Sequence, residues 1–111
     1  MLPSGLVVVL EYCDLSGCSP FASWFDGLNA MAAAKVAVAL SRLEHGNFSN
    51  VKGVGGGVME YKIDFGPGYR IYFGKDGDRL VIMLGGGTKH SQQDDIRVAQ
   101  ARWADYKKRK K

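Results

Sequence analysis

Hydrophobic and polar positions along the chain predict, first, a strand followed by two helices. A short apolar and β-branched run, 6–12, predicts a buried strand. Apolar residues spaced i, i+3, i+4 and i+7 over 21–28 predict a helix that Ser19 caps and Pro20 begins. The alanine-rich segment Ala30–His45 predicts a second helix, ended by a glycine. The two helices would form a helical hairpin.

Three further strands are predicted in the second half of the chain. Alternation of apolar and polar residues over 58–65 is typical of a half-exposed strand. After the turn at 66–68, residues 69–73 predict the next strand, and Asp76-Gly77 predicts a tight hairpin. The apolar run 80–84 predicts the last strand, which we expect to be the central or best-buried one.

Glycines and a final helix complete the pattern. The glycine-containing segment 47–57 predicts a loop, and the glycines at 85–87 predict the end of the last strand. Ser91 and Asp94 have the S-x-x-D spacing of a helix start. The buried stripe of that helix would consist of Ile96, Ala99, Trp103 and Tyr106.

The predicted order, β-α-α-β-β-β-α, defines a small α+β fold. Short hairpin connections require the last three strands to form an antiparallel meander. The first strand could join the edge of this sheet or pair in parallel with one of its strands. We expect helices on one face and one domain over 1–111, because 111 residues leave no room for two independent cores.

Composition narrows the class of protein. The chain is 46% hydrophobic and 23% charged, as in ordinary globular domains. The longest apolar run, 6–10, is far shorter than the roughly 20 residues that a membrane span requires. Residues 1–5 contain no lysine or arginine and therefore do not fit a secretory signal. We expect a cytoplasmic protein without a membrane partner.

Positive charge is concentrated at the end of the chain. The formal net charge is +4, whereas the last ten residues alone contribute +5. The basic tail, 107–111, could contact phosphates through Lys107, Lys108 and Arg109, or it could be a solvated helix end favoured by the helix dipole. Because the tail contains no apolar residue, we expect it to fray or stay mobile in the free chain.

The two cysteines predict no redox or metal chemistry. Cys13 and Cys18, in a chain without an export signal, favour two reduced thiols over a disulfide framework. A structural zinc site needs about four ligands, and His45 and His90 lie too far along the chain to complete a recognisable pattern. We therefore expect neither a metal nor another cofactor.

Two motifs make the chain resemble a known superfamily. These are G-P-G-Y-R-x-Y-F over 66–73 and G-G-x-K-x-x-Q-x-x-D-I over 86–96, and the segments 19–25, 42–48 and 57–63 fit as well. Together they resemble the RelE/ParE toxins, in the branch called addiction module killer proteins, or phage Gp49-like and HigB-type toxins. The resemblance extends from about residue 8 to residue 108.

The resemblance implies the toxin of a type II toxin–antitoxin pair. Many such toxins have the fold predicted above and cleave mRNA, usually on translating ribosomes. The implied partners are mRNA, the ribosome and a cognate antitoxin encoded adjacently, with a small helix-turn-helix protein favoured. Operator DNA would be bound only through the antitoxin complex. The ParE arm instead inhibits DNA gyrase without cleaving RNA, and a degenerate phage relic that only binds a partner is a third reading.

RNA cleavage without a metal requires few groups. A base takes the proton of the 2′-hydroxyl, cations stabilise the charged phosphorane, and an acid protonates the leaving 5′ oxygen. The products are a 2′,3′-cyclic phosphate or 3′-phosphate and a 5′-hydroxyl. In related toxins lysine, arginine, histidine, glutamate or tyrosine fill these roles.

Four residues are the catalytic candidates. Arg70, whose planar fork suits two phosphate oxygens, shares a predicted strand face with Tyr72. The resemblance implies phosphate stabilisation by this arginine; alternatively, it is an exposed cation paired with Glu60 or Asp64. Glu60 could act as a base or form a cross-strand ion pair, and Lys89 follows the glycines in an exposed loop.

Further residues are candidates for RNA binding. Lys62 shares the strand face of Glu60. His90 could carry a proton near neutral pH or simply face solvent, and Gln92 matches the family motif but could equally bond at a helix start. The other candidates are Lys107, Lys108 and Arg109. Trp24, Phe25 and Trp103 are expected in the core.

Overall fold

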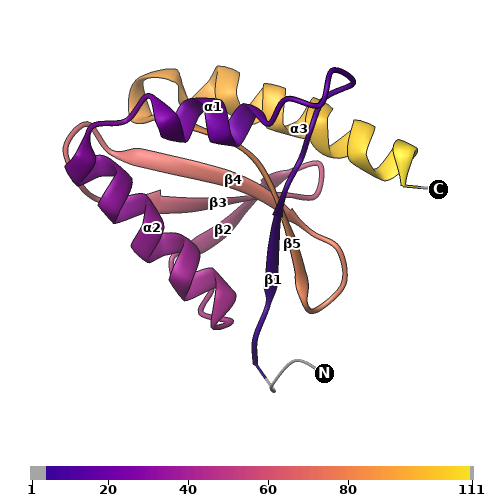
Figure 1. The fold of residues 1–111 in the computed structure, drawn as a ribbon, viewed down its shortest axis with the longest axis horizontal. Coiled ribbons are helices and arrows are strands. Elements are labelled where there is room, and N and C mark those ends of the chain that lie inside the picture. The colour runs from indigo at the N-terminus through magenta and orange to yellow at the C-terminus, as the bar shows by residue number, and fades with distance from the viewer. Residues whose placement is uncertain (1–4, 111) are drawn as a thin grey trace.

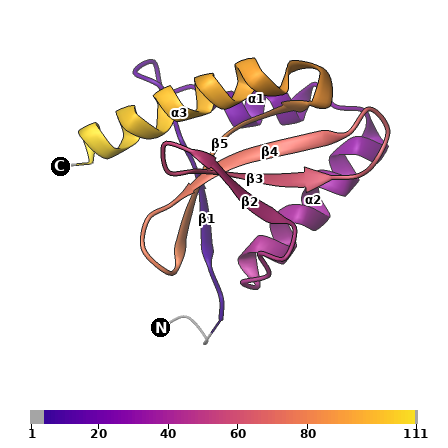
Figure 2. The ribbon, with the colours of Figure 1, turned by 180° about the vertical axis from the view of Figure 1, so that it is seen from behind.

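The computed structural model describes residues 5–110, which form a five-stranded mixed sheet with helices on both faces (Figure 1; seen from behind in Figure 2). The elements are β1 (Val8–Glu11), α1 (Pro20–Asp26), α2 (Ala30–Glu44), β2 (Val51–Gly55), β3 (Val58–Ile63), β4 (Tyr69–Lys75), β5 (Leu80–Thr88), the 3₁₀ turn η1 (Lys89–Ser91) and α3 (Gln92–Arg109). The strand order is β1-β5-β4-β3-β2. Strand β1 lies at an edge, parallel to β5, and the other neighbours are antiparallel. The predicted α+β class and meander are confirmed.

The predicted helical hairpin is present, and its caps explain where each helix begins. The Ser19 hydroxyl oxygen accepts a 3.0 Å hydrogen bond from the Ala22 amide. The side-chain oxygen of Asn29 accepts one of 2.9 Å from the Ala32 amide. These side chains satisfy amide groups that have no partner within the first turn of a helix. Ser19 therefore marks the start of α1, and Asn29 marks the start of α2.

The helices cover both faces of the sheet, so the prediction that they share one face is wrong. Ile71 and Phe73 of β4 belong to a core cluster with α2 and the α1 residue Phe21. Tyr72, between them in β4, belongs to a second cluster with Trp103 of α3. Successive strand residues point to opposite faces, and β4 is buried along both. A strand of this kind requires cover on both sides. The predicted core position of Trp103 is confirmed, whereas Trp24 and Phe25 are partly buried and pack against the core.

The structure contains one strand more than the sequence predicted. Strand β2 lies within the predicted loop 47–57 and pairs with β3 through a turn of glycines 55–57, which have φ of +95°, +63° and +83°. Glycine tolerates these left-handed conformations, which cost other residues free energy. Because glycine also interrupts β2 itself, its alternating pattern is too short to recognise.

Glycines 85–87 extend β5 instead of ending it, and β4, not β5, is the middle strand. A Cβ atom at Gly86 would collide with the ring of Trp24, and one at Gly87 with the carboxylate of Asp95. The glycines therefore allow side chains from both helical layers to approach the strand closely.

The start of α3 also differs from the prediction. Ser91 makes no side-chain capping bond; its hydroxyl instead donates to the carboxylate of Asp95 at 2.5 Å. The turn η1 connects β5 directly to α3. Within residues 5–110, no helix has the length and apolar character needed to cross a membrane.

Candidate active site

The site is built on the sheet face that α3 covers. Glu60 of β3 lies opposite Tyr72 of β4 in the strand register, and Lys62 lies opposite Arg70. Glu60, Arg70 and Tyr72 are only 1%, 6% and 1% exposed. The predicted common face of Arg70 and Tyr72 is confirmed, because Glu60, the residue opposite Tyr72, also lies 3.8 Å from Arg70 Nε. Three of the four catalytic candidates therefore meet beneath α3; we call Glu60, Arg70 and Tyr72 the polar cluster.

Glu60 is the centre of the polar cluster. Its Oε2 accepts a 2.8 Å hydrogen bond from the side-chain amide of Gln92, the first residue of α3. Its Oε1 lies 3.8 Å from Arg70 Nε and 3.7 Å from Lys52 Nζ. Arg70 is therefore paired with Glu60, as in the alternative interpretation, but it is buried and not exposed as that interpretation expected. A buried carboxylate is tolerated where such charges and hydrogen bonds compensate for its lost hydration.

Hydrogen-bonding capacity within the polar cluster is unused. Among the described residues, Glu60 Oε1, Arg70 Nε and the Tyr72 hydroxyl have no hydrogen-bond partner. Buried polar atoms in folded proteins nearly always have one, because leaving them unsatisfied costs about 1–3 kcal/mol each. An acceptor, a cationic donor and a hydroxyl concentrated at one point form a suitable arrangement for a polar ligand that both donates and accepts hydrogen bonds.

Gly68 brings Arg70 and Lys89 together. Its carbonyl accepts the Lys89 amide at 2.8 Å and Arg70 Nη1 at 3.3 Å. A Cβ atom on Gly68, whose φ is +81°, would lie 3.4 Å from Arg70 Nη1 and 3.6 Å from Lys89 Cβ. The turn before β4 is therefore in contact with both cations. The Lys89 side chain is exposed, so the site pairs a buried cation with a solvent-accessible one.

Tyr72 keeps its proton over the ordinary pH range. Burial raises the pKa of its hydroxyl strongly, and the charge of Glu60 raises it further. The phenol is thus a hydrogen-bond donor and a potential acid at neutral pH, not a base. The charge of Asp95 contributes in the same direction, and Asp95 occupies the space left by Gly87, the residue opposite Arg70.

The remaining RNA-binding candidates fall into two groups. Lys62 is exposed and opposite Arg70, and His90 is exposed next to Lys89. Lys62 and His90 are thus exposed next to residues of the site, whereas Gln92 contacts the polar cluster through its bond to Glu60. Lys107 lies about 22 Å from Gln92 along the axis of α3, at 1.5 Å per residue. Lys107, Lys108 and Arg109 are therefore remote from the polar cluster.

Comparison with known proteins identifies the family. Residues 23–104 match the family described as "Phage derived protein Gp49-like (DUF891)". The chain belongs to this Gp49-like family. It is also 43% identical, over 81 residues, to an uncharacterized protein of Haemophilus influenzae, an alignment that covers 72% of this chain and 82% of the relative.

Membership gives the polar cluster its context. Gp49-like proteins form the phage branch of the RelE-like toxins and are generally toxins of toxin–antitoxin systems. The matched region contains Glu60, Arg70, Tyr72 and Lys89, and it ends before the basic tail.

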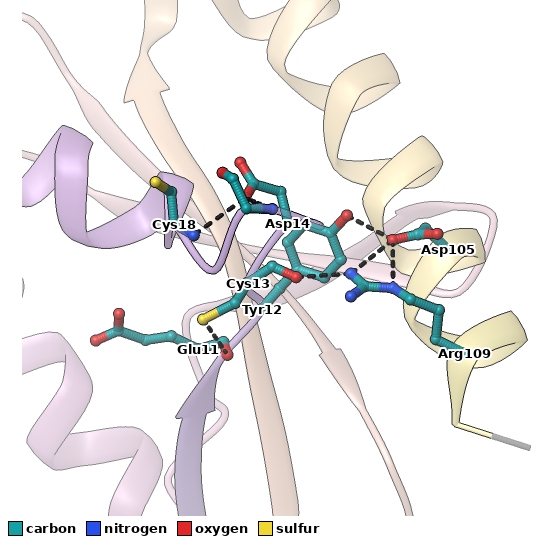
Figure 3. A network of polar contacts seen from close by, with 8 residues as sticks. Glu11, Tyr12, Cys13, Asp14, Cys18, Asp105 and Arg109 are labelled. Carbon is teal, nitrogen blue, oxygen red and sulfur yellow. Dashed lines mark hydrogen bonds and ion pairs between the residues drawn. The ribbon is translucent and has the colours of Figure 1, made fainter.

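The basic end of this Gp49-like chain is helical to Arg109 and makes side-chain contacts, although the sequence predicted that it lacks an anchor. Helix α3 continues to Arg109, whose Nη2 donates to the Cys13 carbonyl at 2.6 Å and whose Nε donates to Asp105 at 2.8 Å. Figure 3 shows this guanidinium beside the Tyr12 ring, whose centroid is 5.1 Å away. Lys110 bonds to Asp76 at 2.6 Å. Charged side chains thus supply the anchor that apolar residues do not; Lys111 lies outside the described residues.

Sequence reasoning did not identify two residues of the site, Lys52 and Asp95. Lys52 lies in the unrecognised strand β2, directly opposite Glu60. The contact of Asp95 depends on Gly87, and the glycine run was the available signal.

Cys13 and Cys18 are exposed free thiols. No group of three or more His, Cys, Asp or Glu side chains within residues 5–110 is arranged to hold a metal ion.

Proposed function

We propose that this Gp49-like chain is the toxin of a type II toxin–antitoxin pair and acts as an mRNA endoribonuclease that needs no metal. The observation that carries the proposal is the polar cluster, in which a carboxylate, a guanidinium and a neutral phenol meet beside the exposed Lys89. Attack of the 2′-hydroxyl on phosphorus requires a base, a cation and an acid, and these groups are present in the cluster and Lys89.

Each group has a role in the proposed reaction. The Glu60 carboxylate accepts the proton of the 2′-hydroxyl as the 2′ oxygen bonds to phosphorus. Arg70 and Lys89 stabilise the negative charge of the phosphorane. As the bond from phosphorus to the 5′ oxygen breaks, Tyr72 gives that oxygen its proton, leaving a 2′,3′-cyclic phosphate and a 5′-hydroxyl. Transfer of the proton from Glu60 to Tyr72 restores both groups.

Because the polar cluster is buried, the proposal has to include a way for RNA to reach it. Glu60 is 1% exposed and accepts a hydrogen bond from the Gln92 amide, so the proposal includes a shift of the start of α3 when RNA binds. The exposed Lys89 and Lys62 mark where the phosphate backbone would first make contact. We propose ribosome-bound mRNA in the cytoplasm as the substrate. The cognate antitoxin, a small helix-turn-helix protein encoded adjacently, would cover the same region.

Mapping of transcript ends tests this function. Induction in bacteria should arrest growth and generate new 5′-hydroxyl ends in mRNA, whereas Arg70→Ala should lower cleavage by about 10²- to 10³-fold, as for other lost transition-state donors. Growth arrest with intact transcripts and double-strand DNA breaks would contradict the nuclease and support gyrase inhibition. Normal growth together with intact transcripts would contradict both activities.

A further inference from the structure

A cationic cleft lies beside the polar cluster, between α2 and the edge of the sheet. It measures about 650 Å³ and includes residues of α2, the start of β2 and the end of β3. Both ribbon views place α2 beside this end of β3 (Figure 1, Figure 2). The register explains the opening: β2 begins at Val51, opposite Tyr61, so β3 extends beyond its edge neighbour. We call this feature the α2 cleft.

Positive charge dominates the α2 cleft. Its lining includes four exposed cations, Lys35, Arg42, Lys52 and Lys62, but only two carboxylates, Glu60 and Asp64. Lys52 is paired with Glu60 at 3.7 Å. Among the described residues, neither Lys35, Arg42 nor Lys62 forms an ion pair. The cleft therefore attracts anions with charge that the protein itself does not neutralise.

The side chains of the α2 cleft are partly fixed in place. Arg42 Nη1 and Asn50 Nδ2 both lie 3.5 Å from the Tyr61 hydroxyl oxygen, and Lys35 Nζ lies 5.3 Å from the centroid of the Phe65 ring. Lys35 and Arg42 are seven residues apart on α2, which places them on the same helix face and about 10 Å apart along its axis. They can contact successive parts of an extended anionic chain.

We propose that the α2 cleft binds the phosphate backbone of single-stranded RNA on one side of the cleaved bond. This proposal rests on the proposed nuclease function. RNA is favoured over an acidic peptide by continuity with the polar cluster: Glu60 belongs to both, and Lys62 lies opposite Arg70. A strand whose cleaved phosphate contacts Arg70 and Lys89 would continue past Lys62 and Lys52 to the cations of α2. Grooves that bind single strands commonly follow the backbone with positive charge in this way.

Salt-dependent binding of a 2′-O-methyl RNA oligonucleotide tests the α2 cleft, because this probe has no 2′-hydroxyl to react. The Lys35→Gln, Arg42→Gln double variant should reduce the slope of log affinity against log salt by about 1.4, at about 0.7 per lost phosphate contact. When salt is raised from 50 to 200 mM, the affinity of the double variant should therefore fall by a factor about sevenfold smaller than the affinity of the unmodified chain does.

Two further variants separate the α2 cleft from effects of net charge or folding. Lys75→Gln with Arg97→Gln removes the same charge at exposed positions outside the cleft and should leave the slope unchanged. Lys35→Arg with Arg42→Lys keeps both charges and should retain the original slope. Thermal unfolding of all variants checks that the fold is intact.

The outcomes separate the α2 cleft from the nuclease. Equal slopes for the unmodified chain and the Lys35→Gln, Arg42→Gln variant would overturn the cleft proposal. So would a variant that binds the oligonucleotide normally but associates poorly with the antitoxin, since the cleft would then serve a protein partner. Binding that depends on the cleft, in a chain that leaves unmodified RNA intact, would support the cleft and contradict the nuclease.

Discussion

The side-chain amide of Gln92 donates a 2.8 Å hydrogen bond to the carboxylate of Glu60, 32 residues earlier in the chain. The first residue of α3 thereby covers a buried charge on β3. Because Glu60 also faces Arg70 and Lys52, this bond connects the helix to the ionic part of the candidate site.

Removing the Gln92 amide should destabilise the fold. Gln92→Ala leaves a buried carboxylate oxygen without its donor, so we expect the free energy of unfolding to fall by about 1–3 kcal/mol. Gln93→Ala, at the exposed neighbouring position, is the matched control and should change it by less than about 0.5 kcal/mol. Urea unfolding measures both, and equal stabilities would show that the bond contributes nothing.

Acid should destabilise the chain through three surface carboxylates. Hydrogen bonds from Ser16, Lys110 and Tyr12, respectively, are the largest causes of the lowered pKa values of Asp14, Asp76 and Asp105. Unfolding restores the ordinary pKa of about 3.9, so the unfolded chain binds more protons below that value. The stabilisation is complete above about pH 5 and is lost as the pH falls through the lower folded values.

Urea unfolding at pH 7, 5 and 3 checks this dependence. We expect little change from these groups between pH 7 and 5 and a loss of stability below about pH 4. Asp105→Asn should reduce the loss, whereas Asp78→Asn at an exposed turn position should not. Stability that rises toward pH 3 would contradict the assignment.

The sequence predicted those parts of the fold where periodicity and caps coincide. Ser19 predicted the start of α1, and alternation over 58–65 placed Glu60 and Lys62 on one strand face. Glycine-rich segments were not predicted correctly, because glycine has no side chain that would indicate which face of a strand it occupies. Strand β2 and the extension of β5 were missed for this reason.

The candidate site was predictable only in part. The common face of Arg70 and Tyr72 follows from local alternation. The contacts of Glu60 with Gln92 and of Gly87 with Asp95 depend instead on how α3 crosses the sheet, which no local pattern determines. The apolar run of β4, interrupted only by Arg70, could have indicated that this strand is covered on both faces.

Arg109 should contribute to stability in a way that its neighbour does not. Its guanidinium connects α3 to the Cys13 carbonyl, whereas Lys108 is exposed and has no such bond among the described residues. Arg109→Gln should lower the urea midpoint, and Lys108→Gln, with the same charge change, should leave it unchanged. Truncation after Tyr106 removes the Arg109 contacts and should therefore destabilise the fold as well. Equal midpoints for the two substitutions would show that the Arg109 contacts are unimportant.

Tyr72→Phe should separate the proposed chemistry from the fold. The Tyr72 hydroxyl is buried and has no hydrogen-bond partner among the described residues, so its removal should leave the free energy of unfolding unchanged or raise it by about 1–3 kcal/mol. As the proposed acid, the same hydroxyl should support cleavage by about 10²- to 10⁴-fold. Tyr106→Phe is the matched control, because Tyr106 donates a 2.8 Å bond to Asp76 away from the polar cluster. That control should lose stability and retain cleavage, and a Tyr72→Phe variant that cleaves RNA at the original rate would remove Tyr72 from the mechanism.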